Sequence, residues 1–214
     1  MEKTSKEDQK QVWENISKEW HEFKQNPSKN AQEFLKNKKG KILDLGSGSG
    51  RNIIGLDLKN KEMYLVDFSA NMIDLAEKRA KELGVEKSIK GYVASIDSLP
   101  FENNFFDYAI CVAALHCIET PEARAEVIEE LFRALKFGGE AEIEVWNKDS
   151  ERFKNAPKEK FVSWRDKGER YYYLYTKEEI INLFKSKGFE IKEELEHRVN
   201  IGFIVKKPEN EKQN

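Results

Sequence analysis

The chain has 214 residues, which suits one α/β domain with a large core and is short for two full domains. Its formal net charge is −2, so a globally basic nucleic-acid binder is not indicated, although a local basic patch stays open. Cys111 and Cys117 do not make a disulfide framework in a chain of this length, and we expect reduced thiols. Residues 1–10 contain no apolar signal core, and the apolar run at 108–115 is too short to span a bilayer. We therefore expect a cytoplasmic location.

The predicted elements begin with two helices. Apolar residues at helical spacing predict an amphipathic helix over 11–23, Pro27 ends it, and Ser28 caps a second helix to about residue 37. Strands are then expected at 41–46, 62–67, 91–95, 106–115, 140–146, 189–195 and 201–205, with helices at 70–83, 121–135 and 176–187. Gly138-Gly139 is expected to close the second of these helices, and residues 150–175 show no clear period. Strands alternating with helices predict an α/β fold with a mostly parallel sheet, and the closing hairpin predicts one antiparallel strand.

A glycine-rich turn follows the first predicted strand, where residues 44–50 read DLGSGSG. Ligands bind at the carboxyl ends of the strands in this type of sheet. Glycines let backbone approach a ligand closely, and their N–H groups hold an anion such as a carboxylate. Asp44 stands two residues before the first glycine and suits an ammonium group beside that carboxylate. The predicted ligand-binding residues here are Asp44, Gly46, Ser47, Gly48 and Gly50.

Two familiar phosphate-binding patterns are not met by this turn. A G-x-G-x-x-G dinucleotide pattern needs glycine at position 51, which holds Arg51. The Gly-Lys-Ser/Thr of a Walker loop does not follow either. An NAD-binding protein is therefore disfavoured.

Acids also follow the second and third predicted strands. Asp67 suits two hydrogen bonds from a ribose diol, and Asp97 suits an adenine amino group, with Ile96 packed on the ring. We include the adjacent Phe68 and Ser98 in this predicted site and predict no metal site. Each acid alone is as easily a helix cap or a solvated loop residue. Three of them at successive strand ends, beside the glycine turn, favour one nucleoside pocket.

These segments together resemble the class I S-adenosylmethionine (SAM)-dependent methyltransferases over residues 42–205. The matching pieces are 44–50, Asp67 with Ser69, 97–101, 106–107 and 135–139. The resemblance implies SAM as the cofactor and a Rossmann-like, seven-stranded α/β sheet with one reversed strand. It also suggests a helical cap at 1–37, a methyltransferase domain at 38–207 with a substrate-side insertion at 151–175, and a polar tail at 208–214.

A narrower resemblance is to the tRNA wobble-uridine carboxymethyl methyltransferases of yeast and of the human AlkB-type homologue. It rests on residues 11–35, 112–120 (VAALHCIET), 144–149 (EVWNKD), 160–164 (KFVSW) and 169–175 (ERYYYLY). It implies tRNA as the substrate and a small zinc-binding activator subunit as a partner. The sequence departs from the family where Cys117 replaces a second His, Phe23-Lys24 replaces Thr-Arg, and Ser28 and Ser163 replace Trp and Pro. The basic insertion of the eukaryotic members is also short here.

The chemistry of such an acceptor fixes what the site must supply. A carboxymethyl group is ionised at neutral pH, so methyl transfer needs alignment and cations rather than a general base. We expect His116 to hydrogen-bond the acceptor, Lys24 to hold its carboxylate, and Arg170 to bind a phosphate while a ring of 171–173 stacks on a base. Weaker candidates are Trp146, Arg152 and Trp164, and Lys154, Lys158, Lys160, Arg165 and Lys167 suggest a local basic surface. Each has a plain structural alternative as a packed ring or a solvated charge.

Other functions stay open beside the tRNA hypothesis. The first alternative keeps the enzyme and changes the acceptor to a small molecule, such as a quinone precursor or a carboxylic acid. Near-neutral charge and the short insertion favour it, whereas His116 and the Arg170-Tyr-Tyr-Tyr segment disfavour it. The second is a non-catalytic SAM-binding module, against which the intact glycine turn and acids argue.

Overall fold

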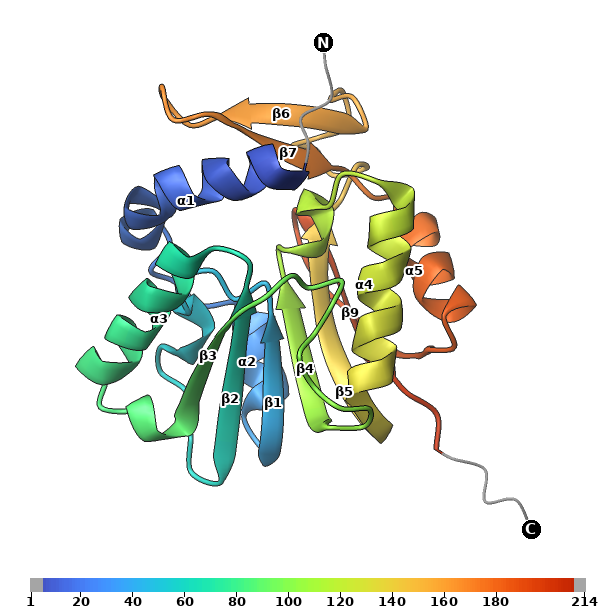
Figure 1. The fold of residues 1–214 in the computed structure, drawn as a ribbon. Coiled ribbons are helices and arrows are strands. Elements are labelled where there is room, and N and C mark those ends of the chain that lie inside the picture. The colour runs from blue at the N-terminus through green and yellow to red at the C-terminus, as the bar shows by residue number, and fades with distance from the viewer. Residues whose placement is uncertain (1–5, 210–214) are drawn as a thin grey trace.

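The computed structural model describes residues 6–209, which form a seven-stranded sheet between two layers of helices (Figure 1). The strand order is β3-β2-β1-β4-β5-β9-β8. The strands are β1 Gly40–Leu45, β2 Lys61–Asp67, β3 Ile89–Val93, β4 Phe106–Val112, β5 Leu135–Trp146, β8 Glu190–Leu195 and β9 Asn200–Lys206. Only β9 runs against its neighbours, so the predicted fold with one antiparallel strand is confirmed. Residues 210–214 of the predicted tail and 1–5 of the predicted cap lie outside the described residues.

The helices begin at polar caps that the sequence supplies. They are α1 Lys6–Phe23, α2 Lys29–Leu35, α3 Ala70–Glu82, α4 Pro121–Ala134 and α5 Lys177–Ser186, with short 3₁₀ turns at Arg51–Ile53, Glu86–Ser88 and Leu115–Cys117. Ser28, Ser69, Thr120 and Thr176 each accept a backbone N–H of the helix that follows. These caps satisfy amide groups that would otherwise lack a partner in the first turn.

Alternation along the strands separates two hydrophobic cores. Leu43 and its neighbours face α4 and α5, whereas Ile42 and its neighbours face α2 and α3. The carboxyl ends of the parallel strands therefore stay clear of both helix layers. The order reverses at β1, which pairs with β2 on one side and β4 on the other. This is the position where sheets of this type bind ligands.

A roof lies over the carboxyl ends of the strands, formed by α1 and a hairpin of β6 Glu159–Ser163 and β7 Glu169–Tyr173 (Figure 1). Gln9 of α1 bonds the edge of β7, donating to Glu169 O at 3.1 Å and accepting from Tyr171 N at 2.9 Å. Glu14 of α1 accepts from Ala70 N at 2.8 Å at the start of α3. Gln9 thus joins the two parts of the roof, and Glu14 fastens the roof to α3.

Two local features differ from the sequence predictions. The hairpin falls inside 150–175, for which we predicted no regular element. Its strands are hard to see in the sequence because Tyr171, Tyr172 and Tyr173 are all buried, so polar and apolar residues do not alternate. The helix α4 ends at Ala134 rather than at Gly138-Gly139, because Leu135 already takes up extended backbone and begins β5.

Two other predictions concern thiols and membranes. Cys111 and Cys117 are free, as predicted. Within residues 6–209, no helix combines the length and the apolar character that crossing a bilayer requires.

Candidate active site

A cavity of about 390 Å³ lies at the carboxyl ends of β1, β2 and β4 under the roof. This volume is typical of sites for small molecules and cofactors. The predicted site residues that line it are Lys24, Gly46, Ser47, Gly48, Asp67, Phe68, Asp97 and His116. The predicted residues that do not line it are Asp44, Gly50, Ser98 and Arg170. The cavity therefore brings together most of the predicted cofactor site with part of the predicted acceptor site.

The glycine turn is held against the second strand by its backbone. Gly46 N and Ser47 N both donate to Val66 O, at 2.9 and 3.0 Å. Gly46 has φ 72°, and a Cβ there would lie 2.3 Å from Cβ of Ala114, so only glycine fits. Gly48 lines the cavity with nothing within 4 Å of its Cβ position, which leaves room for a ligand against its backbone.

Gly50 has a different role from the one predicted for a ligand-contacting glycine. Its φ is 69°, and a Cβ would lie 3.0 Å from Cβ of Ala76 on α3. The turn can therefore close on α3 only without a side chain at this position. Gly50 shapes the cofactor turn from behind the cavity wall.

Asp67 ties the end of β2 to the glycine turn. Its Oδ2 accepts from Gly48 N at 2.9 Å and its Oδ1 from Ser69 N at 3.0 Å. Burial raises the pKa of Asp67 to about 6, although these backbone hydrogen bonds oppose the shift. A carboxylate has lone pairs left for two further donors. Asp67 is thus placed to accept from a ribose diol.

Asp44 lies behind the cavity wall and is almost fully enclosed, with 1% of its surface exposed. Its Oδ2 is 3.5 Å from Nδ2 of Asn52, which does line the cavity, and its Oδ1 has no partner within residues 6–209. Burial raises the pKa of Asp44 to about 7, against the effects of Asn52 and Arg51. An ammonium group bound in this part of the cavity would supply the positive charge that favours the ionised form of Asp44.

Asp97 and Phe68 complete the lining near the third strand. Asp97 lines the cavity beside Ile96, as the adenine end of the predicted site requires. Phe68 lines it next to Asp67. Ser98 is exposed and only its backbone acts here, donating from N to Ser95 O at 3.1 Å in the turn that carries Asp97.

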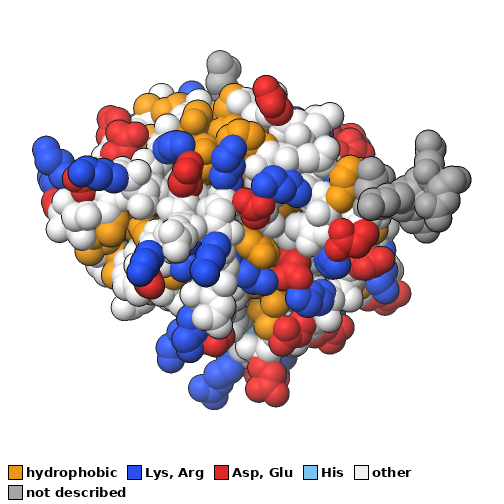
Figure 2. Space-filling view, turned by 90° about the horizontal axis from the view of Figure 1, so that it is seen from below, with side chains coloured by type: hydrophobic (Ala, Val, Ile, Leu, Met, Phe, Trp, Pro, Cys, Tyr) orange, Lys and Arg blue, Asp and Glu red, His pale blue; other side chains and the backbone are white. Residues whose placement is uncertain are grey.

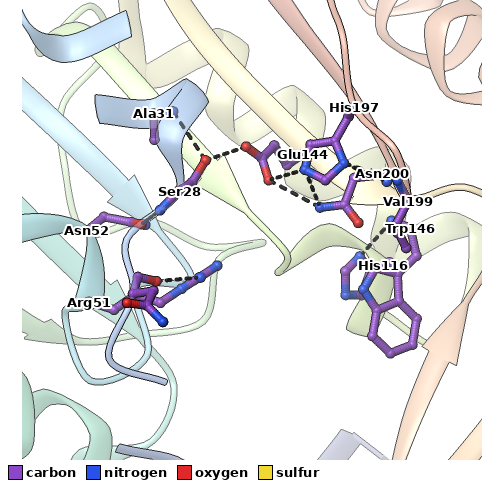
Figure 3. Close-up of polar contacts among 11 residues, drawn as sticks. Ser28, Ala31, Arg51, Asn52, His116, Glu144, Trp146, His197, Val199 and Asn200 are labelled. Carbon is purple, nitrogen blue, oxygen red and sulfur yellow. Dashed lines mark hydrogen bonds and ion pairs between the residues drawn. The ribbon is translucent and has the colours of Figure 1, made fainter. Parts of the chain in front are cut away.

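His116 is buried, lines the cavity and lies where the turn after β4 meets β5 (Figure 3). Its Nδ1 accepts from Trp146 N at 3.1 Å, and its ring stacks on the Trp146 ring at 4.8 Å. Burial and, to a smaller extent, the charge of Lys24 lower the pKa of His116 to about 3. The imidazole is therefore neutral, with its proton on Nε2.

Lys24 follows the last residue of α1 and lines the cavity. Its Nζ lies 5.3 Å from the ring centroids of both Trp20 and Phe23. Burial lowers its pKa, and the positive charges of Arg51, Arg152 and Arg170 add to the effect. No acid among residues 6–209 lies within ion-pair distance of it.

Arg170 lies in the roof beside the cavity. It is 5% exposed, its Nη1 donates to Tyr172 OH at 2.8 Å, and its Nε has no partner within the described residues. Its guanidinium lies 4.9 Å from the Trp164 ring and 5.1 Å from the Trp20 ring. A phosphate would have to enter this aromatic cage to reach it.

Most basic residues of the 154–167 segment are already paired. Lys154 bonds Glu151, Lys158 bonds Glu179, and Arg165 and Lys167 both lie against Glu19 of α1. Arg152 is different, because it has no acidic partner within residues 6–209 and lies 5.4 Å from the Trp146 ring. The expected basic surface is therefore largely neutralised by acids of the same chain.

Several lining residues escaped the sequence prediction, and they share a position in the roof or behind the glycine turn. They are Trp13, Trp20, Arg51, Asn52 and Phe161. Trp13 and Trp20 looked like ordinary apolar positions of an amphipathic helix. Two tryptophans on a helix whose remaining face is strongly polar are the signal that this helix covers something other than the main core.

Comparison with known proteins agrees with this geometry. A family model described as "Methyltransferase domain" matches residues 42–139. The tRNA (carboxymethyluridine(34)-5-O)-methyltransferase ALKBH8 of Mus musculus is 30% identical over 180 residues, which are 80% of this chain and 25% of that protein. The tRNA (carboxymethyluridine(34)-5-O)-methyltransferase of Saccharomyces cerevisiae is 32% identical over 139 residues, which are 63% of this chain and 46% of that protein. The chain thus spans a quarter to under half of these relatives.

Solved structures share the fold at lower identity. A Methanosarcina mazei SAM-dependent methyltransferase has a TM-score of 0.71 and 23% identity, covering 86% of this chain and 100% of that one. The Burkholderia thailandensis 1,6-didemethyltoxoflavin-N1-methyltransferase, with S-adenosylhomocysteine bound, has a TM-score of 0.72, 16% identity and coverage of 98% and 93%. A chain from the complex between the Haloferax volcanii Trm112 methyltransferase activator and its partner has a TM-score of 0.73 and 17% identity. The match covers 96% of this chain and 99% of that one.

The sheet order, the glycine turn and the acids at successive strand ends define a nucleoside-binding methyltransferase domain. Residues 42–139 match the methyltransferase domain family, and the chain shares its fold with a SAM-dependent methyltransferase of known structure.

Proposed function

We propose that the chain methylates the carboxylate of a carboxymethyl-type modified uridine at the wobble position of tRNA. The similarity to the mouse relative supports this acceptor, because it extends over 80% of the chain and so beyond the cofactor-binding part at 42–139. The observation that carries the proposal is a group of cations without acids. Lys24 lines the cavity, the charges of Arg152 and Arg170 act on it from nearby, and none of the three has a carboxylate partner within residues 6–209.

Such a group suits an anionic acceptor. Lys24 is half-buried and Arg170 is buried, and cations in such places are normally paired, so an anion that arrives beside them lowers their free energy. Lys24 would orient the acceptor carboxylate as a point charge, so the reacting oxygen keeps a free lone pair. The exposed Arg152 would contact nearby phosphates, and the buried Arg170 would add positive potential.

His116 acts in this proposal as a hydrogen-bond donor and not as a base. Its Nδ1 is occupied by Trp146 N, and its low pKa leaves a proton on Nε2 at neutral pH. An acceptor that must lose a proton would find no help from it. A carboxylate is already ionised and needs only to be held and aligned.

The cofactor residues take separate parts of SAM. When bound, SAM would supply an electrophilic methyl group. The bond from a carboxylate oxygen to the methyl carbon would form as the carbon–sulfur bond breaks, and S-adenosylhomocysteine would leave. Asp67 would accept from the ribose diol, Asp97 from the adenine amino group, and the glycine turn would hold the methionine carboxylate with its N–H groups. Asp44 would attract the methionine ammonium group from behind Asn52.

A small carboxylic acid or quinone precursor is the second candidate acceptor. The pairing of Lys154, Lys158, Arg165 and Lys167 with acids of the same chain favours it, because little basic surface is left for a polynucleotide. The roof also suits a small molecule enclosed on several sides.

Mass spectrometry of nucleosides separates these candidates. Bulk tRNA that carries carboxymethyluridine is incubated with the protein and SAM, then digested to nucleosides. A methyl ester on that uridine is expected. Tritium transfer from labelled SAM into small carboxylic acids or quinone precursors, with none into tRNA, would instead support the second candidate.

We include a small zinc-binding activator subunit in the proposal. The solved complex of the Haloferax volcanii Trm112 activator, whose partner chain shares this fold, motivates it. Co-purification of such a subunit, and higher transfer activity in its presence, are the expected results. Full activity of the chain alone would remove the subunit from the proposal.

A further inference from the structure

An aromatic surface borders the mouth of the cavity, where the end of α1 meets the turn between β6 and β7. Its rings are Trp20, Phe23 and Trp164, which we call the aromatic rim. The Trp164 ring lies 5.5 Å from Trp20 and 5.6 Å from Phe23, and Trp20 lies 5.9 Å from Phe23. Phe23 is 64% exposed, which is unusual for a large apolar side chain next to other rings.

The rim is held rigidly from below. Trp164 Nε1 donates to Glu19 Oε2 at 2.6 Å, which fixes the indole against α1. The turn is closed by Trp164 N donating to Gly168 O at 2.9 Å. A Cβ at Gly168 would lie 2.8 Å from Cγ2 of Val12, so the turn packs directly on the helix. The Trp164 ring is therefore held in place before any ligand arrives, which reduces the entropy lost on binding.

The rim is also positively charged. Lys24 lies 5.3 Å from the Trp20 and Phe23 rings, and Arg170 lies 4.9 Å from the Trp164 ring. Glu19 lies close to the rim, but it is already paired with Arg165 and Lys167. Its negative charge therefore does not cancel the positive charges of Lys24 and Arg170. The face seen from below in Figure 2 is different, because Lys/Arg and Asp/Glu are mixed across it.

The rim is continuous with the proposed acceptor site. Trp20 and Lys24 line the cavity, whereas Phe23 and Trp164 do not. A chain that enters the cavity at Lys24 would pass over the exposed Phe23. The molecule has four tryptophans, and three of them lie in or next to the aromatic rim: Trp13, Trp20 and Trp164.

We propose that the aromatic rim stacks unpaired bases of the RNA strand that carries the acceptor nucleotide into the cavity. Exposed rings backed by cations are how proteins hold single-stranded nucleic acid, because every base presents a face to stack and a phosphate to pair. Bases in a duplex are stacked on one another and cannot offer these faces. The inference rests on the proposed function, since it places the acceptor in RNA.

The test compares Phe23→Ala with Phe137→Ala. Phe137 is the matched control, an exposed phenylalanine at the start of β5, 44% exposed and 4.5 Å from Lys207 Nζ. Binding of a labelled RNA stem-loop and of a fully paired duplex of the same composition is measured by fluorescence anisotropy. Phe23→Ala is expected to weaken stem-loop binding about tenfold, Phe23→Tyr to restore it, and Phe137→Ala to leave it unchanged.

Several outcomes overturn the inference. They are equal stem-loop affinity of the Phe23→Ala and Phe137→Ala proteins, a duplex that binds as tightly as the stem-loop, and no binding of RNA by the unaltered protein. Loss of self-association or of protein binding in Phe23→Ala, without loss of RNA binding, would assign the rim to a protein partner and also overturns it.

Methyl transfer to the free nucleoside separates this inference from the proposed function. Phe23 does not line the cavity, so Phe23→Ala should methylate free carboxymethyluridine as the unaltered protein does, while KM for tRNA rises about tenfold. If neither acceptor is methylated but the stem-loop results hold, the proposed function fails and the rim still binds RNA. If both acceptors are methylated and KM for tRNA is unchanged in Phe23→Ala, the rim has no such role.

Discussion

The backbone N–H of Trp146 donates to Nδ1 of His116 at 3.1 Å, and the two rings stack 4.8 Å apart (Figure 3). One residue thus fixes both the orientation and the tautomer of the histidine. With Nδ1 used as an acceptor and the pKa lowered by burial to about 3, the Nε2–H is the only group that His116 offers to the acceptor site.

This relationship predicts that methyl transfer does not titrate with His116. Between about pH 5 and 7 the imidazole stays neutral, so its protonation should not lower the transfer rate. His116→Ala should lower kcat about 10- to 100-fold through loss of a hydrogen bond to a charged acceptor, with little change in SAM affinity. Single-turnover transfer and calorimetric SAM binding measure the two effects. A one-proton fall in rate near pH 6.5 that disappears in His116→Gln would contradict the assignment.

The enclosure of Asp44 predicts a pH dependence for cofactor binding. Burial raises its pKa to about 7, and a ligand with an ammonium group favours the ionised form. Affinity should therefore rise with pH up to about 7 and level off above, with a loss of about tenfold per pH unit well below it. Calorimetry with S-adenosylhomocysteine over roughly pH 5.5 to 8 measures this.

The control ligand is 5′-methylthioadenosine, which keeps the nucleoside and lacks the amino acid part. Asp67, whose pKa is about 6, faces the ribose and should affect both ligands alike. Only S-adenosylhomocysteine should show the additional dependence near pH 7. Identical pH profiles for the two ligands would rule out an interaction between Asp44 and the ammonium group.

Asp67 itself gives a prediction about cofactor affinity. Asp67→Ala removes the proposed ribose contact and also the acceptor of Gly48 N, which shapes the turn. Each hydrogen bond to a charged group contributes about 1.5–3 kcal/mol, so SAM affinity should fall at least about 10-fold. Asp74→Ala is a suitable control because Asp74 is an exposed acid on the nearby α3. Unchanged SAM affinity in Asp67→Ala would mean that the ribose lies elsewhere.

The sequence allowed several of the residues that line the cavity to be predicted, because their positions follow from regular structure. Asp67 and Asp97 come after strands of one parallel sheet, and the carboxyl ends of such strands must meet at one edge. The spacing of glycines around Gly46 and Gly48 likewise needs only local backbone geometry. Asp44 and Gly50 were also predicted to contact the cofactor, but they do not line the cavity. Other residues of the turn stand between them and the cavity, and residue spacing does not reveal this.

The acceptor side was less predictable because distant segments build it. Trp164 is held by Glu19, 145 residues away in the chain, and that carboxylate also takes up Arg165 and Lys167. No local pattern reveals that such a pairing will neutralise a basic segment. Arg170 lies in a strand whose two faces are both buried, so neither the strand nor the direction of its side chain shows in the spacing of residues.

Glu142 and Glu140 lie two residues apart on the same face of β5 and are predicted to behave in opposite ways. Glu142 is fully buried, and neither carboxyl oxygen has a partner within residues 6–209. Burial and the neighbouring charges of Glu144 and Asp44 raise its pKa well above the usual value. Burial would also raise the pKa of Glu140, but Lys192 and Lys38 outweigh burial and lower it.

Glu142→Gln should therefore stabilise the protein, and increasingly so as the pH rises. The folded chain keeps the proton on Glu142 after the unfolded chain has lost it, so the native protein loses stability with rising pH above the unfolded pKa. Glutamine keeps the shape and a neutral group, and it removes this loss. Glu140→Gln should do the reverse, because the stability from a lowered pKa is present above the unfolded pKa and is lost in acid. Urea unfolding of both variants at about pH 5 and about pH 8 measures the signs. A Glu142→Gln protein that is less stable than the unaltered chain at the higher pH would show that Glu142 is ionised and paired in the native state.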